Sequence, residues 1–280
     1  MAIAFGIVLV FIGGIVIFES VPYSPLKVQF QADVDRLTDM ENTIFGRDEV
    51  IKESDFVDAP EALQRYIANA GFIGTPKILY TKTFFQDVEL EMDGKTLRID
   101  YTVYNFVMKP DRIALIESSM YGIPFDGYDY IIDGQGGMKG LFGKVFTVFN
   151  QTGYMMDKAQ LVTLLAESPL FPTLWLTDYV TLEHIDVNRA RATITYQGIT
   201  ASGIFTVNEA GEVTTFFTGD RAMSTPDGGM EYVPWTGVFE DYNENDSGIL
   251  FPYRMKAIWN LPDDDLVYFD GDVSHVEYGN

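Results

Sequence analysis

Residues 88–106, VELEMDGKTLRIDYTVYNF, predict a β-hairpin. Apolar residues from Val88 to Met92 alternate with acidic ones, and a period of two is that of a strand with one buried face. Asp93 and Gly94 accept the positive φ angles of a tight two-residue turn. The same alternation resumes after the turn. The stretch therefore predicts that an antiparallel sheet begins here.

The return strand of this hairpin changes character along its length. The face that carries Arg98 and Asp100 is polar at first and becomes aromatic at Tyr104 and Phe106. A strand face that changes from polar to aromatic is expected to pass from solvent to a covered surface. We therefore expect another element to cover the end of this strand.

More strand-like segments follow, each bounded by turn residues. They are residues 112–118, 128–133, 138–149, 180–187, 192–196, 199–207, 213–217, 230–241 and 249–261. Few of the connections are long enough for crossover helices, which favours antiparallel pairing. The regular spacing predicts one large curved sheet or barrel. The glycine-rich residues 133–137 lack the lysine of a phosphate-binding loop and are interpreted as a strand-to-strand turn.

The clearest helical pattern outside the N-terminus lies in residues 155–175, MMDKAQLVTLLAESPLFPTLW. Asp157 is expected to cap the helix, and leucines recur at helical spacing. Pro169 is expected to end it, because the residue before a proline avoids the α region. The apolar tip at Phe171, Leu174 and Trp175 predicts a plug or lid on the sheet. The alternatives are a permanently packed helix and a helix that covers a ligand.

Two further helices are expected before the sheet. Residues 28–40 place Phe30, Val34 and Leu37 on one side. The second begins near residue 60 with a proline in its first turn and ends at Gly71, a typical residue after a helix C-terminus.

The N-terminus contains an apolar run without charge at residues 2–18. Its length is at the short limit of a bilayer span, and we expect an uncleaved single-pass membrane anchor. A cleaved signal peptide is the alternative. The predicted organisation is an anchor at residues 1–20, a helical and polar linker at 21–57 and a β-rich soluble domain at 58–280. The domain is expected to be extracytoplasmic, as is usual for an N-terminal anchor, although the charges flanking the run do not determine its orientation.

Composition excludes several classes of function. The formal net charge is −22 and the pI is near 4.2. Phosphate backbones would be repelled, so nucleic acid is not expected as a partner, and neither is docking on an anionic lipid surface. The chain has no cysteine, which excludes disulfides, thiolate nucleophiles and cysteine-based zinc sites.

Catalytic and metal-binding patterns are weak. His184 and His275 are the two histidines, and there is no Gly-x-Ser-x-Gly elbow. Residues 241–246 resemble the start of a calcium loop, but the expected sixth glycine is absent and a solvated hairpin is the preferred interpretation. We therefore expect no cofactor, no metal site and no catalytic residue, and leave open whether the chain is an enzyme.

Several segments in a fixed order carry a family resemblance. They are PEALQRYIANAG (residues 60–71), GYDYIIDGQGGM (127–138), LLAESPLFPTLWL (164–176), WTGVFEDY (235–242) and ILFPYRMKAIWNLP (249–262). Together they resemble an uncharacterised family of membrane-anchored microbial proteins with a domain of unknown function. The resemblance covers about residues 58–278. It places pattern positions at Glu167, Asp220, Arg221, Trp235, Tyr242, Pro252 and Trp259. One departure is Tyr128, where the pattern has arginine.

The family is in turn distantly similar in architecture to periplasmic lipoprotein-carrier half-barrels. That resemblance implies a concave sheet that holds acyl chains under helices. The expected fold is α+β and mainly antiparallel β, with one large curved sheet, a half-barrel or open barrel, a few helices packed on it and an N-terminal transmembrane helix.

Three functional hypotheses follow. The first is a membrane-tethered binding or carrier domain for an apolar or amphipathic, lipid-like ligand, because the chain combines an apolar N-terminus, long strands and 14% aromatic residues. The alternatives are a non-enzymatic envelope scaffold or protein-interaction domain, whose protein partner the sequence does not name, and a hydrolase. The candidate ligand-binding residues are Tyr101, Tyr104, Phe106, Leu161, Leu165, Phe171, Leu174, Trp175, Trp235 and Trp259.

Overall fold

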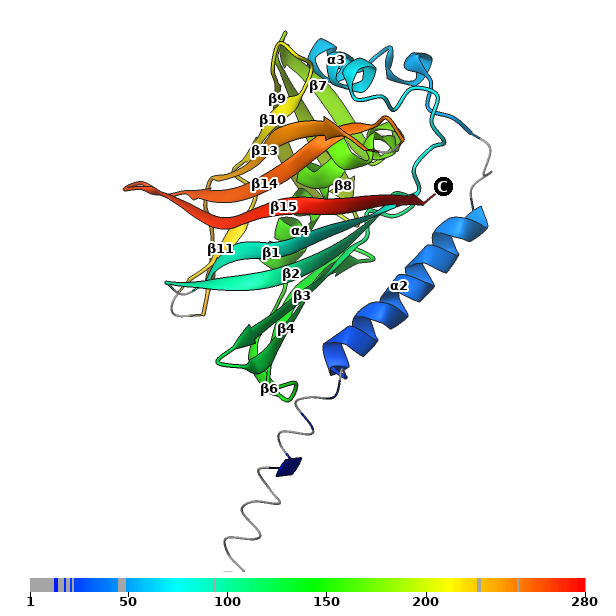
Figure 1. Cartoon of the computed structure of the whole chain (residues 1–280). Helices are drawn as coiled ribbons and strands as arrows, with labels where there is room; N and C mark the ends of the chain where they lie inside the picture. The colour runs from blue at the N-terminus through cyan, green and yellow to red at the C-terminus, as the bar shows by residue number, and fades with distance from the viewer. Residues whose placement is uncertain are drawn as a thin grey trace, which may run out of the picture.

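The structure is a computed structural model, which describes residues 13–14, 18, 21, 23–44, 49–92, 94–225, 228–245 and 247–279 (Figure 1). Most of the predicted anchor at residues 2–18 lies outside these residues. Within the described part, no helix has both the length and the hydropathy needed to cross a membrane.

A single sheet of 13 strands dominates the fold. Its strands are β1 (Tyr80–Met92), β2 (Lys95–Phe106), β3 (Arg112–Met120), β4 (Ile123–Ile132), β5 (Gln135–Phe142), β6 (Phe146–Thr152), β7 (Val180–Asp186), β8 (Arg189–Tyr196), β9 (Ile199–Val207), β10 (Val213–Thr218), β13 (Trp235–Glu244), β14 (Leu250–Asn260) and β15 (Asp265–Gly279). Their spatial order is β6-β5-β4-β3-β2-β1-β15-β14-β13-β10-β9-β8-β7. The neighbouring strands pair antiparallel, which confirms the prediction.

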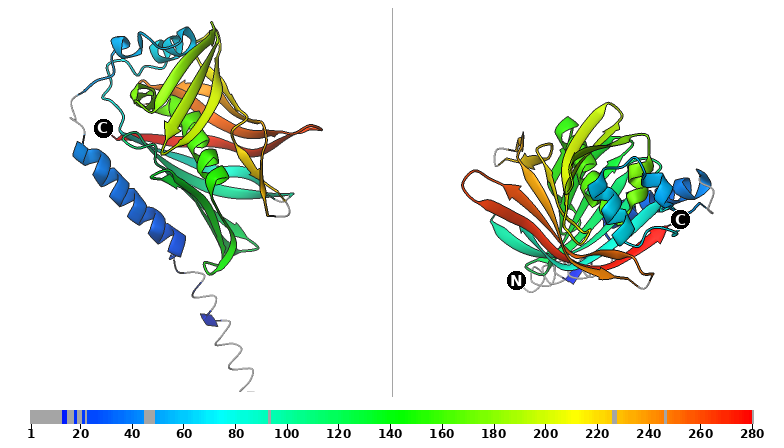
Figure 2. Two further views of the ribbon diagram at one scale, coloured as in Figure 1. Left: turned by 180° about the vertical axis from the view of Figure 1, so that it is seen from behind. Right: turned by 90° about the horizontal axis from the view of Figure 1, so that it is seen from above.

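The sheet consists of two meanders that meet at its centre. The first runs from β1 to β6 and the second from β7 to β15, and the two are joined where β1 pairs with β15. A separate hairpin, β11 (Ala222–Ser224) with β12 (Met230–Tyr232), lies in the connection between β10 and β13. The sheet curves strongly but does not close, because β6 and β7 remain its two edges (Figure 2).

Helix α4 (Tyr154–Glu167) lies inside the curve, whereas α2 (Pro25–Ile44) lies on the outer face (Figures 1 and 2). The short 3-10 helix η1 (Glu53–Phe56) and α3 (Glu61–Asn69) lie at the end formed by β7, β8 and β9. The 3-10 helices η2 (Ser168–Leu170) and η3 (Pro172–Leu176) follow α4. The expectation of one large curved antiparallel sheet with a few helices packed on it is confirmed.

The outer helix α2 explains why the face of β2 changes from polar to aromatic. Phe30, Val34 and Leu37 are buried, as their helical spacing predicts. The ring of Phe30 packs edge-on against Tyr104 at 5.9 Å and Tyr128 at 6.3 Å. The aromatic end of β2 is therefore covered by this helix, and the helix is longer than residues 28–40.

Turn positions account for both the successes and the errors of the strand predictions. The hairpin at residue 94 is confirmed, since Met92 pairs with Lys95 and Gly94 has φ 71°. Residues 138–149 were predicted as one strand and this is wrong, because Gly143 (φ 57°) and Lys144 (φ 64°) turn the chain between β5 and β6. The single strand predicted at residues 230–241 is also wrong.

In that second case the chain forms β12 and then β13, with Val233 and Pro234 between them. Proline has no N–H to donate to a ladder, so it interrupts the strand pattern. The long C-terminal strand β15 was not predicted, although it lies at the centre of the sheet.

Candidate functional site

The concave face is filled by the segment that joins the two edges of the sheet. After the edge strand β6 the chain enters α4, passes through η2 and η3, and reaches the other edge strand, β7. Leu161, Leu164 and Leu165 are all 0% exposed. The α-helix ends at Glu167, two residues before Pro169 and close to the predicted end. The predicted reason is wrong, because Ser168 keeps α-helical dihedral angles and the chain continues into η2. The plug expected in the sequence is therefore a helix seated in the curve of the sheet.

The start of α4 differs from the prediction. Gly153, with φ 107°, precedes the helix, and Asp157 lies within the first turn and does not cap it. Its carboxylate Oδ1 accepts a hydrogen bond from the backbone N–H of Gly136 at 2.7 Å. The prediction of Asp157 as the cap is wrong because the helix begins earlier, and the carboxylate joins α4 to β5.

The apolar tip that follows α4 is packed into the core. Phe171 and Leu174 are 0% exposed and Trp175 is 4% exposed. The indole Nε1 of Trp175 donates to the Ser168 hydroxyl at 2.7 Å, so its polar atom has a partner. The ring lies 6.0 Å from that of Tyr66. The tip thus contacts α3 as well as the sheet.

A buried ion network attaches the end of α4 to the sheet. Arg112 on β3 donates to both carboxylate oxygens of Glu167, at 2.8 and 2.9 Å, and to Asp129 on β4 at 2.9 Å. Its remaining contact is the hydroxyl of Tyr101 at 2.7 Å. Asn105 also donates to Glu167, at 2.9 Å. One buried cation therefore faces two carboxylates that are largely buried.

Burial and the neighbouring charges shift the pKa values of Arg112 and Tyr101. Burial opposes the charge of Arg112, but Glu167 and Asp129 outweigh it and hold the pKa of the guanidinium above its ordinary value. Burial likewise raises the pKa of the Tyr101 hydroxyl. Gln160 on α4 donates to Asp129, which gives that carboxylate a second partner. The guanidinium consequently remains charged, as the carboxylates around it require.

A second set of polar contacts holds the middle of α4. Arg221 donates to the carbonyl of Ala159 at 3.0 Å and to the Thr163 hydroxyl. Its guanidinium carbon lies 5.1 Å from the ring centre of Trp235 and 5.7 Å from that of Trp259, a cation–π arrangement. The cation is thus placed between the helix and two indole rings of the sheet.

The hairpin β11–β12 adds a cover on the solvent side of α4. Just before the hairpin, the carboxylate of Asp220 forms an ion pair with the ammonium of Lys158 on α4, with Nζ and Oδ1 2.7 Å apart. The Lys158 ammonium lies 5.4 Å from the ring centre of Tyr232 on β12. Ser224 on β11 accepts from Gln151 on β6 at 2.6 Å. The hairpin therefore connects the second meander to the edge of the first.

The ten candidate ligand-binding residues lie on two different faces. Tyr104 and Phe106 are on the outer face, in the cluster covered by α2. The other eight belong to the core between the concave face and the helices: Tyr101, Leu161, Leu165, Phe171, Leu174, Trp175, Trp235 and Trp259.

Five of the seven pattern residues of the family resemblance lie in or around α4, whereas Tyr242 and Pro252 pair with each other on β13 and β14. Glu167, Asp220 and Arg221 make the attachments of α4, and Trp235 pairs across the strands with Trp259.

Tyr128 stands where the family pattern has arginine. Its hydroxyl donates to Asp33 of α2 at 2.9 Å, on the outer face. The charge partner of Asp129 is instead Arg112. Arg112 was not predicted as a site residue. Ala114 and Ile116 share its face of β3, but Ile113 and Leu115 make the opposite face equally apolar, so parity did not single it out.

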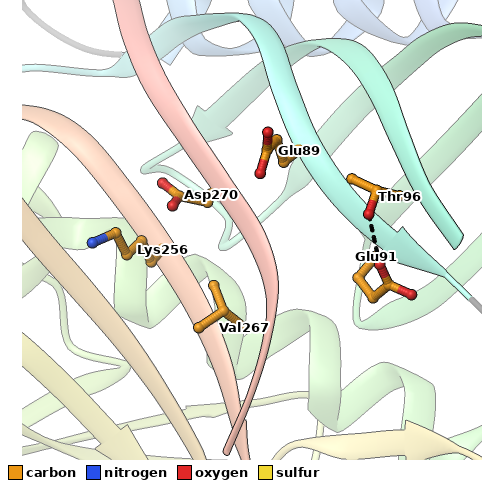
Figure 3. A pocket seen from close by; sticks show the side chains of 6 residues that line it. All are labelled: Glu89, Glu91, Thr96, Lys256, Val267 and Asp270. Atoms are coloured by element: carbon orange, nitrogen blue, oxygen red, sulfur yellow. Dashed lines mark hydrogen bonds between the residues drawn. The ribbon is translucent and has the colours of Figure 1, made fainter. Parts of the chain in front are cut away.

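Two hollows lie on the outer face, over the central strands. One is about 260 Å³ and is lined by Glu89, Glu91, Thr96, Lys256, Val267 and Asp270 (Figure 3). The other is about 230 Å³, and Arg98 and Arg254 lie among its carboxylates. Both are open and mainly charged, so they do not resemble the apolar pockets that hold small ligands.

The weak catalytic candidates do not converge. His184 is exposed on β7. His275 is exposed on β15, where it stacks with Phe84 and lies 4.0 Å from Glu277. Among the described residues, no three His, Asp or Glu side chains are placed to share a metal ion.

Comparison with known proteins identifies a family but no activity. Residues 49–271 match the model described as "Family of unknown function (DUF6544)". No curated protein matches the chain.

Two solved structures are similar in fold. One, from Vibrio parahaemolyticus, is described as an outer membrane lipoprotein-sorting protein domain; it has 9% identity and a TM-score of 0.40, over 79% of this chain and 92% of that one. The other is a DUF1329 family protein from Desulfovibrio piger, with 10% identity and a TM-score of 0.42, over 82% and 94%.

Proposed function

The chain belongs to the DUF6544 family, whose function is unknown, and we propose that it is a membrane-tethered, extracytoplasmic binding domain for an apolar or amphipathic, lipid-like ligand. The binding surface in this proposal is the concave face of the sheet together with α4. The tether is the apolar run at residues 2–18.

One observation carries the proposal: the concave face is closed by a helix and not by further strands. The apolar side chains of α4 pack against the sheet, and the polar contacts that hold it come from side chains such as Arg112 and Arg221. A helix held in this way can leave without breaking any strand ladder. Its departure would expose an apolar concavity with a few polar groups, as ligand sites usually have.

The ends of α4 suit such a movement. Gly153 precedes the helix with φ 107°, a conformation that glycine adopts at low cost. Pro169 and Pro172 follow it. Hinges are commonly a few residues at the ends of elements, and the backbone here changes direction on both sides of the plug.

The charged groups give the ligand a preferred chemistry. Arg112 on β3 and Arg221, just before β11, are cations that contact α4, and carboxylates surround Arg112. An acyl chain would lie along the apolar residues, and a polar head group would replace the contacts that α4 makes with these guanidinium groups.

A scaffold function is the alternative, and the filled concavity favours it. Leu161, Leu164 and Leu165 leave no surface to solvent in the described arrangement. In this reading α4 is a permanent part of the core.

Photo-crosslinking in membranes separates the two functions. The full chain is placed in vesicles that contain a phospholipid with a diazirine on its acyl chain, irradiated, and digested for mass spectrometry. Labels on α4 or on the inner-face residues Trp235 and Trp259 would support the binding domain, and excess unlabelled lipid should reduce them. The outer-face residues Tyr104 and Phe106 serve as the internal control. The absence of labels from α4, Trp235 and Trp259 in a chain that is labelled elsewhere would reject lipid binding in the concavity and leave the scaffold.

A further inference from the structure

One end of the sheet exposes large apolar side chains. Tyr121 is 90% exposed in the turn between β3 and β4, and Val145, Phe146 and Val148 are 59%, 69% and 57% exposed at the turn between β5 and β6 and along β6. We call these four residues the sheet tip. Large apolar side chains grouped on a surface indicate a contact surface for a partner or a membrane.

The two turns belong to one surface. The N–H of Gly143, in the β5–β6 turn, donates to the carbonyl of Pro124, just after the β3–β4 turn, at 2.8 Å. The strands β4 and β6 reach the lower extremity of the sheet in Figure 1, at the end where α2 begins. The tip is therefore a continuous feature of the first meander.

The tip is also where the apolar N-terminal run meets the domain. The Lys144 ammonium donates to the backbone carbonyl of Phe18 at 2.8 Å and to that of Val21 at 2.7 Å. It also lies 5.3 Å from the ring centre of Phe18. Residues 2–18 have a composition that suits a bilayer, and their last residue, Phe18, thus contacts Lys144, which directly precedes Val145 in the sequence.

The segments that form the sheet tip carry no carboxylate. The chain has 41 acidic residues, yet residues 118–125 and 134–156 contain none. The second of these segments contains Lys139 and Lys144. Although Glu19 directly follows the apolar run, the sheet tip itself brings no carboxylate to a hydrocarbon boundary, and the cost of burying one there does not arise.

We propose that the sheet tip inserts into the interface of the same bilayer that residues 2–18 enter. This inference rests on the proposed tethering, and it adds a second contact that fixes the orientation of the domain on the membrane. Tyrosine is enriched at the headgroup level of membrane proteins, and phenylalanine is common on apolar faces that enter the interface. The helix α4 and the concave face would then be held close to the lipid from which a ligand would come.

Tryptophan quenching by lipid tests the contact. The three native tryptophans are buried, at 4%, 5% and 7% exposure. The full chain carrying Phe146→Trp is reconstituted into phosphatidylcholine vesicles with brominated acyl chains. The matched control is Val57→Trp, because Val57 is also 69% exposed but lies beside α3, at the other end of the fold. Tyr121→Trp reports the same surface if the first variant folds poorly.

In brominated vesicles, the tryptophan emission of the Phe146→Trp and Tyr121→Trp chains should shift to the blue and lose intensity. The fraction of emission that bromine quenches in the Val57→Trp chain should not exceed that in the wild type. Equal quenching of tip and control in a chain that floats with the vesicles would overturn the tip contact and leave the tether standing. A tip that is shielded from an aqueous quencher but not quenched by bromine would assign the surface to another protein and overturn the lipid contact. A chain that does not float with the vesicles would overturn the tether and this inference together.

Discussion

The guanidinium of Arg112 and the carboxylate of Glu167 form a two-point ion pair, at 2.8 and 2.9 Å, that joins β3 to the last residue of α4. The Arg112 side chain is 1% exposed and that of Glu167 is 15% exposed. Planar bidentate pairs of this kind fix orientation as well as distance. The end of the plug is therefore set by one arginine that the sheet supplies.

Removing that arginine should destabilise the fold strongly. Arg112→Ala leaves Asp129 and Glu167 buried without their cation, and breaking a buried pair in this way costs about 3–5 kcal/mol. Urea unfolding measures the change. The control is Arg98→Ala, whose ion pairs with Asp87 and Glu89 are exposed, and it should change stability little. Similar losses in the two variants would contradict the structural role of the network.

The close approach of β5 to α4 gives a second prediction. A Cβ at Gly136 would lie 2.8 Å from the Cα of Asp157 and 2.9 Å from the carbonyl oxygen of Met156. Gly136→Ala should therefore displace the start of the helix and cost about 1–3 kcal/mol, as overpacking does. Gly219→Ala is the control, because nothing lies within 4 Å of its added Cβ. The helix contact is refuted if thermal unfolding of the two variants is the same.

The outer helix α2 should detach when its central aromatic residue is truncated. Phe30 is buried against Tyr104 and Tyr128, and Phe→Ala in a core costs about 3–5 kcal/mol. Hydrogen exchange of the α2 amides should accelerate in Phe30→Ala more than exchange in β8 and β9. Val28→Ala, on the exposed side of the same helix, should leave exchange unchanged. Uniform acceleration across the sheet would show that α2 does not unfold separately.

Stability should fall as the pH rises, partly through Glu41. Burial raises its pKa from 4.5 to about 8, and the nearby Asp111 adds to the effect. A carboxyl with a raised pKa binds its proton more tightly in the folded state. Its contribution to stability is therefore fully present below about pH 4.5 and is lost as the pH rises to about 8.

Glu41→Gln should remove this component. Its melting temperature should match that of the wild type near pH 4 and exceed it at pH 9, because the amide carries no buried charge. The amide oxygen can still accept the hydrogen bond that Glu41 accepts from the N–H of Met108. Glu209→Gln, at an exposed turn position, is the control. Parallel pH profiles for Glu41→Gln and the wild type would contradict the raised pKa.

Local patterns predicted much of the architecture because each one reports burial on a single face. The alternation in residues 88–106 predicted the β1–β2 hairpin and its turn. The spacing of Phe30, Val34 and Leu37 predicted the buried side of α2. The leucines of α4 and the proline after it predicted a helix of nearly the right length. The errors at residues 138–149 and 230–241 arose where a turn, in the first case, and a proline, in the second, interrupt a pattern that looks continuous.

The candidate site was predicted less completely, since its polar part depends on contacts between distant residues. Arg112 and Glu167 are separated by 55 positions, and no local period relates them. Tyr104 and Trp235 look alike as aromatic strand residues, yet they lie on opposite faces of the sheet. Parity within a strand shows which residues share a face, but it does not show which face is the inner one.

The sequence by itself determined the antiparallel strands, the three helices and the distribution of charge, because these follow from the order of apolar, polar and turn residues along the chain. The tertiary structure alone decided that β15 pairs with β1, that α4 fills the curve of the sheet and that Arg112 holds it there. Those relationships join segments far apart in the chain. They form because both meanders of the curved sheet bury their apolar inner face against the same helix. The same packing places the acid-free turns beside the apolar N-terminus, where the sheet tip is exposed.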